Sequence, residues 1–320
     1  MKIFIAQKLI AIFVVSLSLA APRPLHAQSP DASTTRAPIS IAILDFGGDA
    51  TAIEVSDILA RSLTRDASPL QLVNRDLTRA AARGAGYAGS LNLTRTEARD
   101  LGSSIGSDFF LTGRAELLRR SSSATNASYY EAYAAVFLVS TRTGRLVLFE
   151  FTKAEAAETT TASAQLRRTL AESVARLHVA ASRAREDETV AAARAAASAG
   201  VSDATVVIED APEGTDGSAE QALRFPQPYR RIRPAYTEQA MRASVEATVD
   251  AAVEINADGA ADNIEIERWA GFGLDEAVIA AIRAAHFRPA TRRANGEAVP
   301  MRVLLRYNFR SPKTPKEAAK

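Results

Sequence analysis

The chain of 320 residues contains no cysteine, three histidines, three methionines and one tryptophan. Without cysteine there can be no disulfide, no thiolate metal site, no cysteine nucleophile and no lipid attached to a cysteine behind a signal sequence. The histidines, His26, His178 and His286, are too widely spaced to suggest a metal site. The sequence therefore predicts neither a metal nor a cofactor.

Strong charge and catalytic motifs are also lacking. The formal net charge is only +2, so attraction to nucleic acid is not indicated, and no P-loop, nucleophile elbow or zincin helix occurs. Gly84–Gly89 matches G-x-G-x-x-G, but it is expected to follow a helix instead of a strand. Glu265 and Glu267 share one strand face, where solvation is expected rather than catalysis. The protein is predicted not to be an enzyme and to have no small-molecule substrate.

One long apolar run lies near the start of the chain, from Leu9 to Ala21, and ends at Pro22. It is shorter than the roughly 20 apolar residues of a membrane-spanning helix. With its flanking lysines it predicts a secretory signal peptide over residues 1–27, cleaved after Ala27. An uncleaved inner-membrane anchor is the alternative, because a short signal-anchor has the same pattern.

Composition divides the remaining chain, which is too long for one small core. Residues 28–38 read as a disordered lead-in, and residues 200–227 read as a linker, because their acidic, Gly- and Ser-containing stretch has too few apolar residues to build a core. Residues 39–199 and 228–310 are predicted to form two domains, followed by a tail at 311–320.

The first domain is predicted to have the element order βαβααβββ and a long trailing helix. Apolar runs and turn residues predict strands at Ile39–Asp45, Leu70–Val73, Phe109–Leu118, Tyr129–Thr141 and Arg145–Lys153. Helical spacing connects the early strands and returns after residue 160. This order predicts an α+β fold with helices packed on a mixed sheet.

Several short segments of this domain resemble the TolB N-terminal domain and its relatives CsgG and LpoB. The resemblance covers residues 38–155 and is carried by Ile41–Phe46, Val73–Arg75, Leu101–Gly102, Asp108–Gly113 and Val139–Gly144. It implies a domain that recurs in assemblies of the cell envelope.

The second domain is predicted to have the order ββαβ. Strands at Val245–Ile255 and Ile264–Trp269 are joined through Asp258-Gly259, which supplies the positive φ that a hairpin turn needs. An apolar stripe from Leu274 to Ala285 predicts a helix, and Val299–Phe309 is the final strand. One helix then covers one face of a small antiparallel sheet, and a core position is favoured for Trp269.

This order and its residues resemble the TonB C-terminal domain over residues 228–310. The family motifs appear here in sequence as Tyr236, Val245–Ile255, Asp258-Gly259, Gly271, Leu274-Asp275, Ala277–Ala285, Phe287-Arg288-Pro289-Ala290 and Arg302–Phe309. The chain departs from the family where Gln-Pro-x-Tyr-Pro is replaced by Arg233-Pro234-Ala235-Tyr236-Thr237.

The resemblance implies protein binding by strand addition along the edge of the last strand. The partner-binding residues that it implies are Arg233, Pro234, Tyr236, Arg302, Val303, Leu304, Leu305, Arg306 and Tyr307. Successive side chains in a strand face opposite sides, so either Leu304 or Leu305 is expected in the core.

Two functions from different classes follow from these observations. The first is a periplasmic, non-enzymatic binding or scaffold protein of a Gram-negative bacterium. It holds an envelope protein, such as an outer-membrane receptor or assembly linked to transmembrane transport. The second is a structural subunit or activator of an outer-membrane or peptidoglycan assembly of CsgG or LpoB type. Neither the oligomeric state nor the identity of the partner is specified by the sequence.

Overall fold

The structure is a computed structural model and describes residues 38–64, 70–122, 127–198, 209–210 and 223–311. The predicted signal peptide, almost all of the predicted lead-in and most of the predicted linker and tail lie outside the described residues. Among the helices in those ranges, none is long and apolar enough to cross a membrane.

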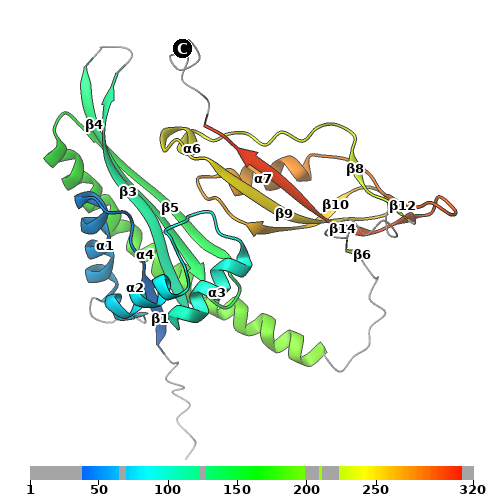
Figure 1. The fold of residues 1–320 in the computed structure, drawn as a ribbon, viewed down its shortest axis with the longest axis horizontal. Coiled ribbons are helices and arrows are strands. Elements are labelled where there is room, and N and C mark those ends of the chain that lie inside the picture. Colours follow the sequence, from blue (N-terminus) through cyan, green and yellow to red (C-terminus); the bar gives the residue numbers. More distant parts are fainter. Residues whose placement is uncertain (1–37, 65–69, 123–126, 199–208, 211–222, 312–320) are drawn as a thin grey trace, which may run out of the picture. The chain divides into compact units, whose positions relative to one another are not determined.

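The N-terminal part is built on a five-stranded sheet in the order β2-β1-β3-β4-β5 (Figure 1). Strand β1 pairs in parallel with β2 and β3, whereas β3, β4 and β5 form an antiparallel meander. We call this the N-terminal sheet, and it confirms the predicted mixed sheet. Its strands are β1 (Ile39–Ile43), β2 (Leu70–Leu72), β3 (Phe109–Ser121), β4 (Ser128–Ser140) and β5 (Leu146–Ala156).

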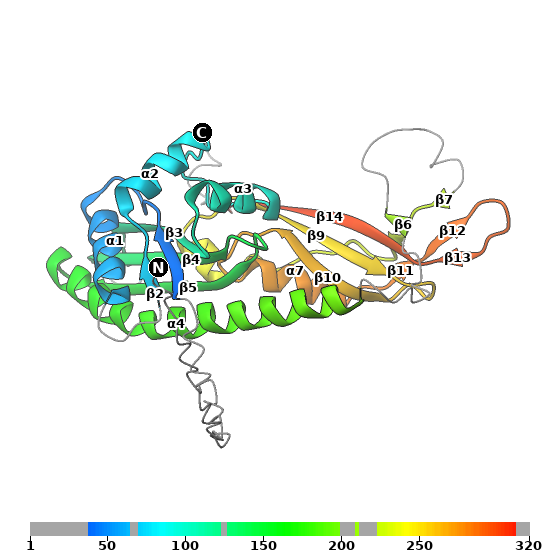
Figure 2. The ribbon, with the colours of Figure 1, turned by 90° about the horizontal axis from the view of Figure 1, so that it is seen from below.

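Helices cover both faces of the N-terminal sheet (Figure 2). They are α1 (Ala50–Leu63), α2 (Arg75–Gly84), α3 (Arg95–Ile105) and α4 (Thr159–Ser198). The apolar stripes of α1 and α4 pack with the alternate side chains of β1 on one face, and those of α2 and α3 pack on the other. Helix α3 begins with a capping box, in which the Thr94 hydroxyl accepts from the Glu97 N–H and the Glu97 carboxylate accepts from the Thr94 N–H.

The C-terminal part is built on a sheet in the order β10-β9-β14-β6, which we call the C-terminal sheet. Strand β9 pairs antiparallel with β10 and β14, and β6 pairs in parallel with the start of β14. Helix α7 (Leu274–Arg283) packs against one face, as the predicted ββαβ order requires (Figure 1). The strands are β6 (Glu209–Asp210), β9 (Ala247–Ile255), β10 (Ala261–Arg268) and β14 (Met301–Phe309).

Short elements complete the C-terminal part. Strand β8 pairs with β11, and β12 pairs with both β7 and β13. Strands β6, β7 and β8 all begin within the range 200–227 that the sequence predicts as linker, because a pairing of two residues leaves no periodic pattern. The short elements are β7 (Leu223–Arg224), β8 (Gln227–Pro228), α6 (Glu238–Arg242), β11 (Phe287–Arg288), β12 (Ala290–Arg292) and β13 (Ala298–Val299).

An aromatic cluster joins the two sheets. Trp269 and Phe272 follow β10 and pack against Phe137 of β4 and Phe149 of β5, with ring centroids 5.4 Å apart for Phe137–Trp269 and 4.9 Å for Phe149–Phe272. Trp269 is 1% exposed, and its indole N–H donates to the Gly144 carbonyl oxygen over 3.3 Å. The described residues from 38 onward belong to one compact unit. The boundary between two domains stays a prediction.

Gly271 tests this junction. At φ +69° a Cβ on Gly271 would lie 2.5 Å from a Phe137 ring carbon and 2.8 Å from one of Phe149, whereas a Cβ on Gly296, at φ +71°, would meet nothing within 4 Å. Both alanine variants carry the left-handed cost of about 1–2 kcal/mol. We expect Gly271→Ala to lower Tm clearly further and to red-shift the emission of the single tryptophan, Trp269, because two packed rings must move. Equal thermal shifts in the two variants, with unchanged emission, would contradict the described packing.

Candidate protein-binding edge

The last strand of the C-terminal sheet has one open side. Strand β9 pairs with β14 over its whole length, from Met301 to Phe309. On the opposite side β6 pairs only with Met301 and Arg302, and no other described strand pairs there. A row of unpaired backbone N–H and C=O groups is a template for an added strand. We call the open side of residues 303–309 the β14 edge.

The side chain of Asn92 shows which backbone groups face this edge. Its amide oxygen accepts from the Thr248 N–H over 2.9 Å, and its amide nitrogen donates to the Thr248 carbonyl oxygen over 2.8 Å. Thr248 is in register with Asn308 of β14, so both of its backbone groups point away from β14. Antiparallel pairs alternate between bonded and non-bonded positions. The N–H and C=O groups of Leu304, Arg306 and Asn308 therefore point to the β14 edge.

Side chains of β14 alternate between the two faces of the sheet. Val303, Leu305 and Tyr307 are partly buried against the cluster beneath α7, and burial raises the pKa of the Tyr307 phenol. Leu304 lies on the opposite face and is 44% exposed. Of the two adjacent leucines, Leu305 is thus the core residue and Leu304 the accessible one.

Arg306 is held against the outer face of the sheet by a buried carboxylate. Its guanidinium donates to both Asp250 oxygens, over 2.7 and 3.0 Å, and Arg268 approaches the same carboxylate at 3.3 Å. Burial raises the pKa of Asp250, but the two arginines outweigh burial and hold that pKa below its usual value. The Arg306 side chain therefore stabilises the pairing of β9 with β14, in addition to any role at the edge.

A second charge network ties β14 to the N-terminal part. Arg302 lies 3.1 Å from Glu265, and Arg95 of α3 lies 2.6 Å from Glu265 and 3.1 Å from Glu267. The two glutamates thus share arginine partners across β10, β14 and α3. Their carboxylates are therefore engaged in ion pairs.

The predicted residues that precede the C-terminal sheet lie in two different places. The Tyr236 ring packs 6.3 Å from the ring of Phe309, at the end of β14, and its hydroxyl donates to the Val245 carbonyl oxygen over 2.7 Å. Arg233 instead lines a hollow beside the C-terminal end of α7. The structure brings Tyr236 to β14 and separates it from Arg233.

The segment Asn92–Thr94 was not identified from the sequence as part of this site. Asn92 also donates to the Trp269 carbonyl oxygen over 2.7 Å, Leu93 accepts from the Trp269 N–H, and Thr94 forms an isolated bridge with Arg268. The segment thereby closes the end of β10. The remainder of β10 contains two register irregularities, which disfavour strand addition. The β14 edge is the more regular open edge.

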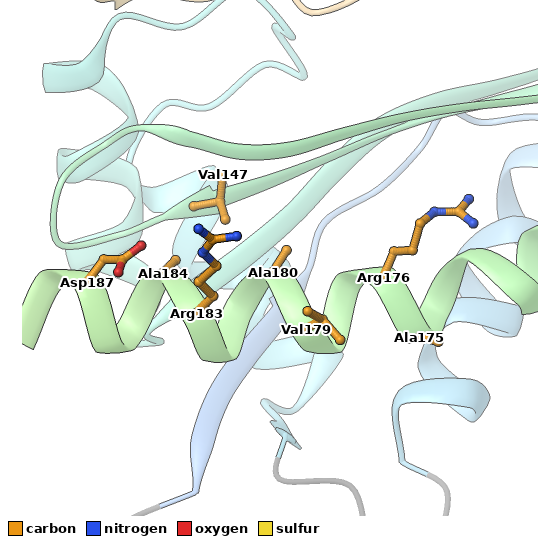
Figure 3. Close-up of a pocket in the computed structure, with 8 residues that line it drawn as sticks. All are labelled: Val147, Ala175, Arg176, Val179, Ala180, Arg183, Ala184 and Asp187. Carbon is orange, nitrogen blue, oxygen red and sulfur yellow. The ribbon is translucent and has the colours of Figure 1, made fainter.

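A separate hollow of about 660 Å³ lies on the N-terminal part, between α4 and Val147 of β5 (Figure 3). Alanines of α4 and Val179, which is 68% exposed, give it an apolar surface. Arg176 at its side is paired with Glu150 at 2.7 Å. Among the described residues, no cluster of three or more His, Asp or Glu able to hold a metal occurs.

Residues 232–311 match the family described as Gram-negative bacterial TonB protein C-terminal, which confirms the predicted TonB resemblance. The solution structure of the Pseudomonas aeruginosa TonB C-terminal domain is 24% identical, with 28% of this chain and 89% of that one covered and a TM-score of 0.24. The LpoB C-terminal domain from Salmonella enterica is 18% identical. The match covers 37% of this chain and 82% of that one, with a TM-score of 0.27. The hypothetical protein CT253 from Chlamydia trachomatis is 13% identical. The match covers 45% of this chain and 98% of that one, with a TM-score of 0.33. No curated protein sequence matches the chain.

A buried carboxyl fixes the turn between β10 and α7. The two oxygens of Asp275 accept from the N–H groups of Ala270 and Gly271, each over 2.9 Å. Burial raises the pKa of Asp275 to about 7, against these two hydrogen bonds, which lower it. The same turn carries Trp269 and Phe272 into the aromatic cluster.

Asp275 gives the free energy of unfolding a defined pH dependence. Its pKa is about 7 in the folded protein against a reference value of 3.8, so the folded state binds this proton more tightly. Its contribution is fully present below about pH 4 and is lost as the pH rises through 7. We expect denaturant unfolding of the wild-type protein to show declining stability between about pH 4 and 7. Asp275→Asn, although less stable overall, should lose that decline. The same slope in both proteins would contradict the assignment.

Proposed function

We propose that the protein is a non-enzymatic binding module of the cell envelope that holds an extended segment of a protein partner along the β14 edge. The observation that carries this proposal is the open stretch of residues 303–309, where Leu304, Arg306 and Asn308 direct backbone groups outward. An added strand gains its affinity from such main-chain groups and its specificity from alternate side chains.

The β14 edge limits what a partner strand can be. Strand β6 occupies the backbone at Met301 and Arg302, which leaves residues 303–309, a length of about 20 Å. On the outer face the exposed Leu304 lies between Arg302 and Arg306, whose guanidinium groups are held by carboxylates. A small apolar side chain of the partner, placed over Leu304, fits this face better than a charged one.

The periplasm is the location that best fits this function. The predicted signal peptide and the TonB family match over residues 232–311 support it, and an uncleaved inner-membrane anchor is the alternative. A partner in outer-membrane transport, such as a receptor, is suggested by the family resemblance. The segment Arg233–Thr237 lacks the family's glutamine and second proline, so a partner other than a TonB-dependent receptor is equally compatible.

A structural subunit or activator of an envelope assembly is the second candidate. The apolar hollow between α4 and β5 favours it, because exposed Val179 and the outer edge of β5 together offer a surface to another chain. Size-exclusion chromatography with light scattering separates the candidates. A binding module is expected to run as a monomer or dimer, whereas a large oligomer would favour the structural subunit.

Leu304→Pro is the sharpest test of strand addition. Proline removes the outward N–H and obstructs an added strand, but no bond to β9 is lost. We expect Tm to fall by only a few degrees and the partner captured by crosslinking in whole cells, identified by mass spectrometry, to disappear. Leu304→Ala, which keeps the N–H, is the matched control and should retain the partner. Proline at Arg306 is a poorer probe, because it also deletes the ion pair with Asp250.

A folded Leu304→Pro protein that captures the same partner at wild-type yield would show that binding does not run through the β14 edge.

A further inference from the structure

A second hollow, of about 470 Å³, lies between the extended segment after β8 and the C-terminal end of α7. Ala281 of α7 lines it, together with Ala284 and Ala285 just after the helix. Arg230, Arg231 and Arg233 line it from the extended segment, together with Tyr229 and His286. No aspartate or glutamate lines this hollow, which we call the basic hollow.

The arginines of the C-terminal part fall into two groups. Arg242, Arg268, Arg302 and Arg306 have carboxylate partners within 4.0 Å, and several others have none among the described residues. Within the described residues, Arg230, Arg231 and Arg233 form no ion pair. Uncompensated positive charge in a concave surface concentrates anions, and guanidinium groups bind carboxylates in a planar, two-bonded geometry.

The aromatic ring of Tyr229 adds a contact surface beside these charges. Tyr229 is 62% exposed, and the Arg288 guanidinium lies 5.5 Å from its ring centroid. Arg288, a fourth arginine, therefore contacts the Tyr229 ring, and the ring remains accessible to solvent. Exposed tyrosine next to arginine is a typical composition of protein-binding surfaces.

The backbone of the extended segment is also open. The Tyr229 N–H donates to the His286 carbonyl oxygen over 3.0 Å. No backbone–backbone hydrogen bond within the described residues involves residues 230–236. In an extended chain, residues i and i+2 lie on the same side about 6.6–6.8 Å apart. Arg231 and Arg233 therefore match carboxylates at alternate positions of a second extended chain.

We propose that the basic hollow binds an acidic, extended protein segment whose alternate carboxylates pair with Arg231 and Arg233, with Arg230 adding to the attraction. A protein segment fits better than a membrane surface, because the charges border a concave, partly alanine-lined space instead of projecting from a broad face. This site is separate from the β14 edge and does not depend on strand addition there.

The test uses the full chain and a fluorescein-labelled peptide that alternates Glu and Thr, with fluorescence anisotropy as the readout. We expect the wild-type protein to bind this peptide and not its Gln-Thr counterpart. The triple variant Arg230→Ala, Arg231→Ala, Arg233→Ala should bind at least about tenfold more weakly. A control with the same loss of charge replaces exposed arginines of α1, α3 and α4, namely Arg61→Ala, Arg99→Ala and Arg168→Ala, and should bind as the wild-type protein does.

Leu304→Pro separates this proposal from the proposed function, because it should leave binding of the Glu-Thr peptide unchanged. The proposal is overturned if the wild-type protein does not bind the peptide, or if the triple variant, folded by circular dichroism, binds it as tightly as the control. Binding to phosphatidylglycerol vesicles in place of the peptide would likewise assign the basic hollow to a membrane surface and overturn the proposal.

Discussion

The structure depends on the requirement that backbone N–H and C=O groups of a sheet find partners. In the C-terminal sheet that requirement is met unevenly. Strand β9 is paired on both sides, Asn92–Thr94 closes the end of β10, and β6 covers the start of β14. The stretch of residues 303–309 is left with outward groups and no described strand partner. A protein that exposes such an edge beside a well-packed core has a ready means of holding another chain.

The aromatic cluster between the two sheets leaves the β14 edge open. Full burial of one aromatic or large aliphatic side chain contributes about 1.5–3 kcal/mol, and Trp269, Phe272 and Phe137 are all almost completely buried. Asn92 donates hydrogen bonds to the carbonyl oxygens of Thr248, in β9, and of Trp269, just after β10. These contacts lie on the side of β9 that faces away from β14. Among the described residues, the hydrogen bonds of this junction do not use the outward backbone groups of residues 303–309. Docking within the chain and binding of a partner can therefore occur together.

Much of this could be predicted from local sequence. The ββαβ order follows from apolar spacing and the Asp258-Gly259 turn, and strict alternation predicts that one of Leu304 and Leu305 is core. Asn92 could not be found in this way, because its partners lie over 150 residues away in the chain. The ion pair of Arg306 with Asp250 depends on the register of β9 against β14, which no local pattern fixes. The grouping of Arg230, Arg231 and Arg233 around one hollow also depends on the fold and could not be predicted from the sequence.

The central claim, that the β14 edge accepts a strand, is tested most directly by residue-resolved amide hydrogen exchange with and without the captured partner. The outward N–H groups of Leu304, Arg306 and Asn308 should exchange quickly in the free protein and become protected in the complex. Those of Val303, Leu305 and Tyr307, bonded to β9, should be protected in both. Protection of the outward groups already in the free protein, or no gain in the complex, would contradict the account.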